Sequence, residues 1–254
     1  MEALRHAGFA LGAEIDIRWI DSEEISQQYL SDGKNFRATT ASEPGAGEGK
    51  KPSSPEHILA GLDGIIVPGG FGNRGIEGMI LAAQYARENR IPYLGICLGM
   101  QIAVIEYARN AAGLPDADSG EFNEQCRHKV IDFMPGQSED IDKGGTLRLG
   151  AYPCNILPGT TMERCYGARQ ISERHRHRYE LNNDYRRLLQ DSGLTLSGLS
   201  PDGTLVETVE LTDLPFYVGV QYHPEFKSRP NKPHPLFKGF IGAACGKNRE
   251  GNRE

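Results

Sequence analysis

The sequence predicts an α/β fold, with a mostly parallel central sheet flanked by helices and an antiparallel β-rich portion. The parallel part is predicted by two successive strand, glycine turn and helix patterns, at 64–89 and 93–111. The antiparallel part is predicted by β-rich segments at 194–199, 205–211 and 216–222, because a Pro201-Asp202-Gly203 turn joins the first two as a hairpin. We expect one domain over residues 1–245.

Composition excludes several classes of protein. The net charge of -6 argues against nucleic acid as the main partner. No apolar run reaches the roughly 18 residues of a membrane helix, and the amino terminus lacks the apolar core of a signal peptide, so we expect no membrane partner and a cytoplasmic protein. The 5 cysteines are scattered without a C-x-x-C pair, which fits neither a disulfide framework nor a zinc site.

The remaining elements follow from periodicity in chain order. Leu4, Ala7 and Leu11 have helical spacing and precede an alternating, strand-like pattern at 14–20. Residues 36–57 are rich in Ser, Thr, Gly and Lys, which predicts a disordered surface loop. Residues 112–145 lack periodicity, 146–152 and 155–157 have strand patterns, and a helix is expected through 235–244. The polar residues 246–254 predict a disordered tail.

The turn Gly95-Ile96-Cys97-Leu98-Gly99 joins a buried-strand pattern to a helical pattern. A nucleophile on a tight strand-to-helix turn needs glycine on both sides, because its strained backbone brings neighbouring side chains into collision. The same turn places a cysteine sulfur over the first free N–H groups of a helix, which favours thiolate. A free cysteine is more often a small buried hydrophobe, so the glycines rather than the cysteine alone favour a nucleophile.

A second chemical motif, His223-Pro224-Glu225, follows the strand pattern at 216–222. If the strands that precede Cys97 and His223 are parallel neighbours, the thiol and the imidazole meet at one sheet edge. His223 would then take the thiol proton, while Glu225 would orient the ring from its other nitrogen. Taken alone, this motif is also compatible with a plain surface turn.

An acyl-transfer site also needs donors for an oxyanion. The N–H of Leu98, next after the nucleophile, and that of Gly70, in the turn Pro68-Gly69-Gly70-Phe71-Gly72, are the expected donors. A glycine-rich turn alone is weak support, because it also serves as a flexible connection.

The strip Arg174-His175-Arg176-His177-Arg178 alternates two residue types. The two histidines suggest a metal pair, but the interleaved arginines repel a cation and no third ligand is apparent. An anion-binding strip, or a charged face against a partner, suits the arginines better.

Together, Gly95 to Gln101 and His223-Pro224-Glu225 resemble the motifs of the class I, triad-type glutamine amidotransferases, whose fold is flavodoxin-like. The stretches 68–72, 144–150, 174–180 and 220–230 narrow the likeness to the glutaminase domain, carboxyl-terminal in the whole enzyme, of the CTP synthase family. The resemblance covers nearly the whole chain outside 36–57 and the tail.

The resemblance implies a Cys97 nucleophile, a His223 base, a Glu225 orienter and a γ-glutamyl thioester intermediate. It implies glutamine contacts from Gly70, Leu98, Gly99, Met100, Gln101, Glu121 and Arg178. Charge agrees with the last two, since free glutamine carries an ammonium for Glu121 and a carboxylate for Arg178.

The same resemblance implies the partners. L-glutamine is the substrate, and the ammonia goes to an amino-terminal synthetase domain, absent from this chain, that aminates UTP at the expense of ATP in pyrimidine biosynthesis. No metal or other cofactor is expected in this domain, because ATP and Mg²⁺ belong with the synthetase domain, and the full-length enzymes are homotetramers. The isolated chain is then expected to bind glutamine but to be poorly activated.

Two alternatives stay open at this point. One is a different class I glutaminase or a γ-glutamyl hydrolase that uses the same triad. The other is a regulatory or binding module in which the arginine strip docks a partner.

Overall fold

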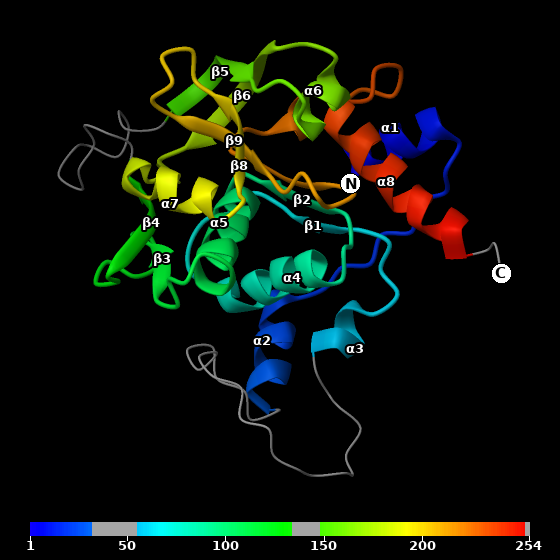
Figure 1. Ribbon diagram of the computed structural model, residues 1–254. Coiled ribbons are helices and arrows are strands. Elements are labelled where there is room, and N and C mark those ends of the chain that lie inside the picture. The colour runs from blue at the N-terminus through cyan, green and yellow to red at the C-terminus, as the bar shows by residue number, and fades with distance from the viewer. Residues whose placement is uncertain (32–54, 134–147, 252–254) are drawn as a thin grey trace.

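The computed structural model describes residues 1–31, 55–133 and 148–251 and contains a seven-stranded and a three-stranded sheet (Figure 1). The strands are β1 Ile65–Val67, β2 Tyr93–Ile96, β3 Ala117–Ser119, β4 His128–Phe133, β5 Arg148–Ile156, β6 Gln170–His177, β7 Tyr179–Leu181, β8 Thr195–Leu199, β9 Val206–Glu210 and β10 Tyr217–Val220. The helices are α1 Glu2–Leu11, α2 Ser22–Ser31, α3 Pro55–Leu59, α4 Ile76–Glu88, α5 Leu98–Asn110, α6 Thr161–Tyr166, α7 Arg186–Asp191 and α8 Pro235–Gly251, with 3₁₀ turns η1 Asn183–Tyr185 and η2 Pro224–Lys227.

Three parallel strands, in the order β1-β2-β10, carry the two chemical motifs. Val67 pairs with Gly95, and Val220 pairs with Ile96, so the three strands end at the same level of the sheet. The strands before Cys97 and His223 are parallel neighbours, which is the condition under which the thiol and the imidazole meet. Because parallel strands present their carboxyl ends at one edge, the segments that follow β1, β2 and β10 meet there.

The expectation of a mostly parallel sheet is wrong. The large sheet is mixed, with the order β1-β2-β10-β9-β8-β5-β6, and every pair beyond β10 is antiparallel. The strand and helix repeats that force parallel pairing occur only in the first half of the chain. Later strands are joined by connections such as the turn at 200–205, which is too short for a parallel crossover.

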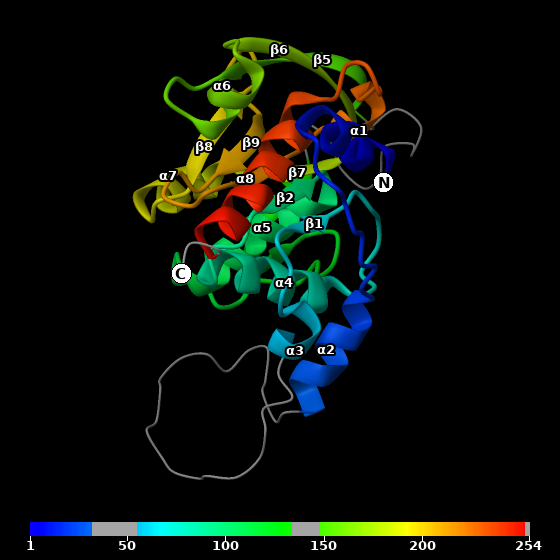
Figure 2. The ribbon, with the colours of Figure 1, turned by 90° about the vertical axis from the view of Figure 1, so that its right-hand side faces the viewer.

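Helices cover both faces of the parallel strands. On one face α4 and α5 pack on a core that includes Ile80, Met100 and Val104, all at most 4% exposed. On the other face α1 and α8 lie side by side, as both views show, over a second core that includes Phe237 and Ile241 (Figure 2). No helix in the described parts of the chain is long and apolar enough to cross a bilayer.

Two short strands lie inside the stretch 112–145 that lacks periodicity. There β3 pairs in parallel with β4, which pairs antiparallel with β7, and this small sheet packs beside α5. It is held to α5 by Arg109, whose Nε donates to the carbonyl oxygen of Ala117 at 2.7 Å. The small sheet thereby carries Glu121, which follows β3, toward the sheet edge.

At the amino end the strand predicted for residues 14–20 is absent. This segment connects α1 to α2, and Ile15 and Ile17 are half-buried while Glu14, Asp16 and Arg18 are exposed. The alternation therefore reports the buried side for Ile15 and Ile17 but not for Trp19, which is 72% exposed, and the segment has no ladder partner among the described residues. Apolar alternation predicts the buried side, not the hydrogen bonds.

Most of the predicted loop 36–57 lies outside the described residues, and its last residues begin α3, which packs beside α2. At the other end α8 runs to Gly251, further than the residue 244 at which the apolar pattern stops. The helix therefore includes residues 246–251 of the tail that was predicted to be disordered. The last three residues of the predicted tail also lie outside the described part.

Candidate active site

Cys97 lies at the junction of β2 and α5 with φ 52 and ψ -101, a conformation that costs a non-glycine residue about 1–3 kcal/mol. Gly95 and Gly99 make the turn possible. A Cβ on Gly95 would lie 2.4 Å from the carbonyl oxygen of Gly99, and a Cβ on Gly99 would lie 2.1 Å from that of Val67. Both glycines are thus required by close backbone approach, and Gly99 fixes the helix start against β1.

The surroundings of Cys97 come from three strands. Its backbone N–H donates to the carbonyl oxygen of Val220 at 2.7 Å, which ties the turn to β10. Its Sγ lies 3.9 Å from the carbonyl oxygen of Arg176 in β6 and 3.7 Å from Nε2 of Gln221. With 3% of its surface exposed, the sulfur is held in a fixed position at the sheet edge.

His223 follows β10 at the same edge, and its Nδ1 lies 2.7 Å from Oε1 of Glu225. Burial lowers the pKa of His223, but its interactions with Cys97 and Glu225 outweigh burial and raise this pKa to about 9. Nε2 is buried and makes no hydrogen bond to the described residues, so the bond of fixed geometry is the one to Glu225. His223 therefore keeps one nitrogen free on a ring that is oriented from the other.

The glycine-rich turn after β1 packs directly on these side chains. A Cβ on Gly69 would lie 2.8 Å from Cε1 of His223 and 3.6 Å from Cβ of Cys97, so both face the same glycine. A Cβ on Gly70 would lie 3.1 Å from Cδ2 of Leu98. The two predicted oxyanion donors, Gly70 and Leu98, thus belong to neighbouring segments.

Glu121 and Arg178 are charged groups near this turn. Gly72 N–H donates to Oε1 of Glu121 at 3.4 Å. Burial raises the pKa of Glu121, while the Gly72 hydrogen bond and the charge of Arg178 oppose that rise. Nε of Arg178 is buried without a partner among the described residues. A buried guanidinium N–H without an acceptor is costly, so this group is suited to an incoming anion.

Met100 and Gln101 point into the fold. Met100 is fully buried in the core, and Nε2 of Gln101 donates to the carbonyl oxygen of Tyr179 at 3.0 Å and to Oε1 of Gln221 at 3.4 Å. Any substrate contact from either residue is therefore made by its backbone, as it would be for Gly99.

The arginine and histidine strip alternates across β6. Arg174 and Arg176 are exposed, and their guanidinium carbons lie 5.9 Å and 5.6 Å from the ring centroids of Phe226 and Phe71. His175 and His177 face inward and are joined by a 2.9 Å contact between Nδ1 and Nε2. Burial lowers the pKa of His175 to about 2 and that of His177 to about 3, so both rings are neutral.

Sequence reasoning missed the polar groups beneath β6. Arg148 lies 2.7 Å from Glu207 and 3.9 Å from Glu180, and all three side chains are buried. Burial and the charge of Glu207 raise the pKa of Glu180 to about 8 despite Arg148. Gln221, which contacts the Cys97 sulfur, was also missed. A polar residue at an inward-facing strand position was the available signal for Glu207 and Gln221.

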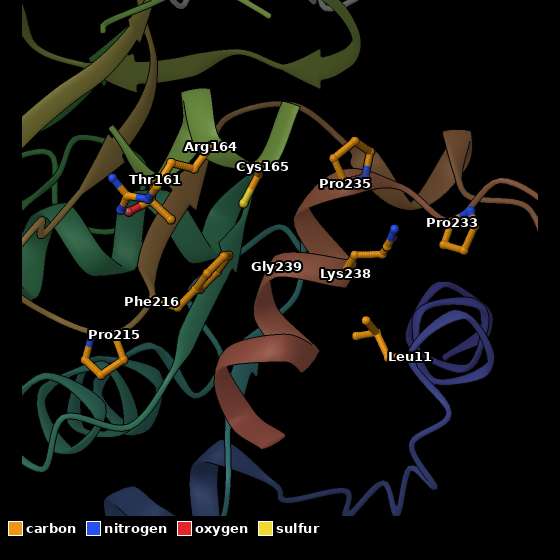
Figure 3. A pocket seen from close by; sticks show the side chains of 10 residues that line it. All are labelled: Leu11, Thr161, Arg164, Cys165, Pro215, Phe216, Pro233, Pro235, Lys238 and Gly239. Carbon is orange, nitrogen blue, oxygen red and sulfur yellow. Dashed lines mark hydrogen bonds between the residues drawn. The ribbon is translucent and has the colours of Figure 1, made fainter. Parts of the chain in front are cut away.

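A cavity lies away from this sheet edge. A cavity of about 470 Å³ lies between α1, α6 and α8 and is lined by residues such as Leu11, Cys165 and Lys238 (Figure 3). It contains none of the predicted site residues. No group of three or more His, Cys, Asp or Glu in the described ranges is arranged to hold a metal ion.

Comparison with known proteins identifies the family. Residues 1–243 match the profile described as Glutamine amidotransferase class-I. The chain is 54% identical over 248 residues to a CTP synthase of Carboxydothermus hydrogenoformans, with 98% of this chain and 42% of the relative covered. It is 54% identical over 254 residues to a CTP synthase of Roseiflexus castenholzii, with 100% and 41% covered. The chain thus spans less than half the length of these curated relatives.

A solved structure resembles this one over nearly its whole length. The glutaminase domain of Trypanosoma brucei CTPS, described with bound acivicin, matches with a TM-score of 0.81 and 38% identity. The match covers 96% of this chain and 86% of that chain.

Proposed function

The chain belongs to the class I glutamine amidotransferase family, and from this premise we propose that it hydrolyses L-glutamine to glutamate and ammonia through a thioester on Cys97. One observation carries the proposal. A cysteine on a strained strand-to-helix turn and an imidazole oriented by a carboxylate pack on the same glycine, Gly69, at the carboxyl ends of the parallel strands β1, β2 and β10.

In the first half-reaction, His223 takes the thiol proton and the Cys97 sulfur attacks the side-chain amide carbon of glutamine. The N–H groups of Leu98 and Gly70 donate to the amide oxygen of the substrate, which becomes negative after the attack. Loss of one such donor typically lowers the rate by about 100- to 1000-fold. The imidazolium then gives its proton to the leaving nitrogen as the carbon–nitrogen bond breaks, which releases ammonia and leaves a γ-glutamyl thioester. The raised pKa of His223 supports a ring that holds the proton taken from the thiol until the carbon–nitrogen bond breaks.

In the second half-reaction, His223 takes a proton from water, and the resulting hydroxide attacks the thioester carbonyl carbon. The carbon–sulfur bond breaks, glutamate leaves, and Cys97 recovers its proton from His223. Glu225 holds the ring in one orientation through both steps, because its carboxylate occupies Nδ1 and leaves Nε2 to carry the proton.

We assign the recognition of the amino-acid end of the substrate to Glu121 and Arg178. The buried, unpartnered Nε of Arg178 supports a role in binding the α-carboxylate, and the half-buried carboxylate of Glu121 supports a role toward the ammonium. Backbone contacts from Gly99, Met100 and Gln101 complete this proposed binding site.

The likeness to CTP synthases, of which the chain matches 41–42%, supports a destination for the ammonia. We propose that a synthetase portion uses it for the ATP-dependent amination of UTP to CTP, with ATP and Mg²⁺ bound in that portion. A homotetramer of the whole enzyme belongs to the same proposal.

The test is to treat the chain with a diazoketone analogue of L-glutamine and to locate the label by mass spectrometry. We expect one equivalent on Cys97, protection by L-glutamine, and no label in His223→Gln. Ammonia release is then measured with and without a separately expressed synthetase domain, and it should rise when the domain is added.

Either of two results would overturn the proposal. One is a label on a cysteine other than Cys97. Cys154 and Cys165 serve as internal controls that should stay unlabelled, because burial raises their pKa values to about 12 and about 11. The other is cleavage of γ-glutamyl peptides in preference to free glutamine, which would make the chain a γ-glutamyl hydrolase.

A further inference from the structure

Glu173 is a buried carboxylate, 1% exposed, on the inward face of β6. Its Oε1 accepts from three donors: the hydroxyl of Tyr166 at 3.2 Å, Nζ of Lys227 at 3.1 Å and Nε2 of His234 at 3.1 Å. Nδ1 of His234 accepts from the N–H of Leu236 at 3.3 Å, so Nε2 carries the hydrogen that points to Glu173. One carboxylate oxygen thus joins three segments that are distant in the sequence.

These partners flank His223 and Glu225, the proposed base and the carboxylate that orients it. Tyr222, which immediately precedes His223, bonds the Tyr166 hydroxyl at 3.1 Å, so it reaches Glu173 through one intermediary. Lys227 ends the 3₁₀ turn η2, which contains Glu225, and its Nζ also donates to the carbonyl oxygen of Ser172 at 2.6 Å. Glu173 therefore holds the segment 222–227 on both sides.

The segment needs such an anchor because η2 is only four residues long and lies at the surface. The Glu225 side chain is 35% exposed and Phe226 is 52% exposed, so Pro224 is the one buried residue of η2. At its start, the N–H of His223 donates to the carbonyl oxygen of Arg174 at 2.8 Å. Beyond that bond, the Arg174 guanidinium lies near the exposed Phe226 ring, and Lys227 links η2 to a buried group of β6, Glu173.

We propose that Glu173 is a positioning residue for His223 and Glu225. Through Lys227, it sets the place of Glu225 relative to His223. This inference rests on the proposed function, since it names what keeps the general base oriented. Without the Glu173 carboxylate, Lys227 loses its buried partner and η2 is held mainly by backbone bonds. Glu225 then departs from its 2.7 Å contact with Nδ1.

A purely structural role makes different predictions from a positioning role. A structural role lowers stability and reduces activity by the same factor whether or not Glu225 is present. A positioning role acts through Glu225, so its effect disappears once the Glu225 carboxylate has been removed. It also lowers kcat without raising KM, because none of the residues bonded to Glu173 is assigned to glutamine recognition.

The test is a double-mutant cycle in the full chain. Lys227→Met removes the link at a residue whose side chain is 47% exposed, which carries little risk to folding, and Glu173→Gln removes the charge at the centre. Each is made in the wild-type and Glu225→Gln backgrounds. Lys238→Met, at an exposed lysine of α8, is the matched control.

For Lys227→Met and Glu173→Gln alone we expect kcat for glutamine to fall between about 10- and 100-fold with KM within about twofold, since a misplacement of about 1 Å has costs of this size. In the Glu225→Gln background the further loss should be less than about twofold. Equal losses in the two backgrounds, or unchanged kcat in both single variants, would overturn the inference.

A second measurement does not depend on turnover. The pKa of the His223 ring, followed by NMR in chain labelled at the imidazole carbons, should fall in Lys227→Met, and Lys227→Met should not lower it further in the Glu225→Gln background. An unchanged pKa in Lys227→Met contradicts the inference even if the chain proves inactive. Absence of labelling of Cys97 in the wild type would instead contradict the proposed function, so the two failures are distinguishable.

Discussion

Replacing Gly69 with alanine adds one methyl group at the meeting point of the two proposed catalytic side chains. The new Cβ would lie 2.8 Å from Cε1 and 3.5 Å from Nδ1 of His223, whereas ordinary van der Waals contact begins at 3.4 Å. The imidazole must therefore move by about 0.6 Å or more, since the Cβ is part of the backbone frame and cannot rotate away. Gly69 does not have a positive φ, so the change strains side-chain contacts and not the turn itself.

A displacement of the His223 ring by this distance should affect the reaction more than it affects folding. We expect kcat/KM for glutamine to fall about 100-fold, in line with the cost of misplacing a reacting group by about 1 Å. Stability should fall by about 1–3 kcal/mol, as is typical of overpacking. Circular dichroism and urea denaturation measure the second effect, and ammonia release measures the first.

The matched control is Gly242→Ala, where an added Cβ meets nothing within 4 Å. Its activity should equal that of the wild type, and its stability should rise slightly, because alanine is the better helix former. If Gly69→Ala retained kcat/KM within about threefold of the wild type, the ring would not be the group that the turn confines, and the assignment of His223 would fail.

Four further outcomes follow from the site. Cys97→Gly should be more stable than Cys97→Ala by about 1–3 kcal/mol in urea denaturation, because only glycine relieves the cost of the positive φ, and equal stabilities would show that the turn is unstrained. Glu225→Gln should lower the pKa of His223 from about 9 toward about 7–8, since a hydrogen bond to a charged group is worth about 1.5–3 kcal/mol; NMR titration gives the value, and an unchanged pKa refutes the link. The raised pKa of His223 also means that its contribution to stability is complete below its ordinary 6.5 and is lost as pH rises through about 9, which denaturation midpoints across that range would measure. Arg178→Gln should raise KM for glutamine about 10-fold or more with a smaller effect on kcat, and a fall in kcat at constant KM would place Arg178 outside the substrate clamp.

Local rules were enough to predict the nucleophile turn. A side chain on Gly95 would collide with the backbone of Gly99, four residues away, and one on Gly99 would collide with the neighbouring strand β1. The motif alone therefore indicates why both positions are glycine. The parallel pairing of β2 with β10 was also predictable, because each strand leads directly into a chemical motif and two such motifs function only at one edge.

Sheet direction and the buried polar groups were less predictable. The hairpin of β8 and β9 was predicted from its turn, but β5 also pairs with β8, across about 40 residues of chain, and no one segment indicates that pairing. Glu173 and Glu207 look like ordinary strand residues in the sequence, since a carboxylate is buried only when partners from other segments surround it. Glu121 and Arg178 were reached through family resemblance, and charge alone would not have selected them.

The hydrogen bond from the Cys97 amide to Val220 has a consequence for amide exchange. This N–H lies between two central parallel strands and is buried, so solvent deuterium reaches it only when β2 separates from β10. Its exchange should therefore occur with the free energy of global unfolding, whereas amides near the ends of helices exchange by fraying. A single slow amide at the proposed nucleophile would thus report the integrity of the proposed reaction centre under native conditions, and ligands that bind there should slow it in proportion to their affinity.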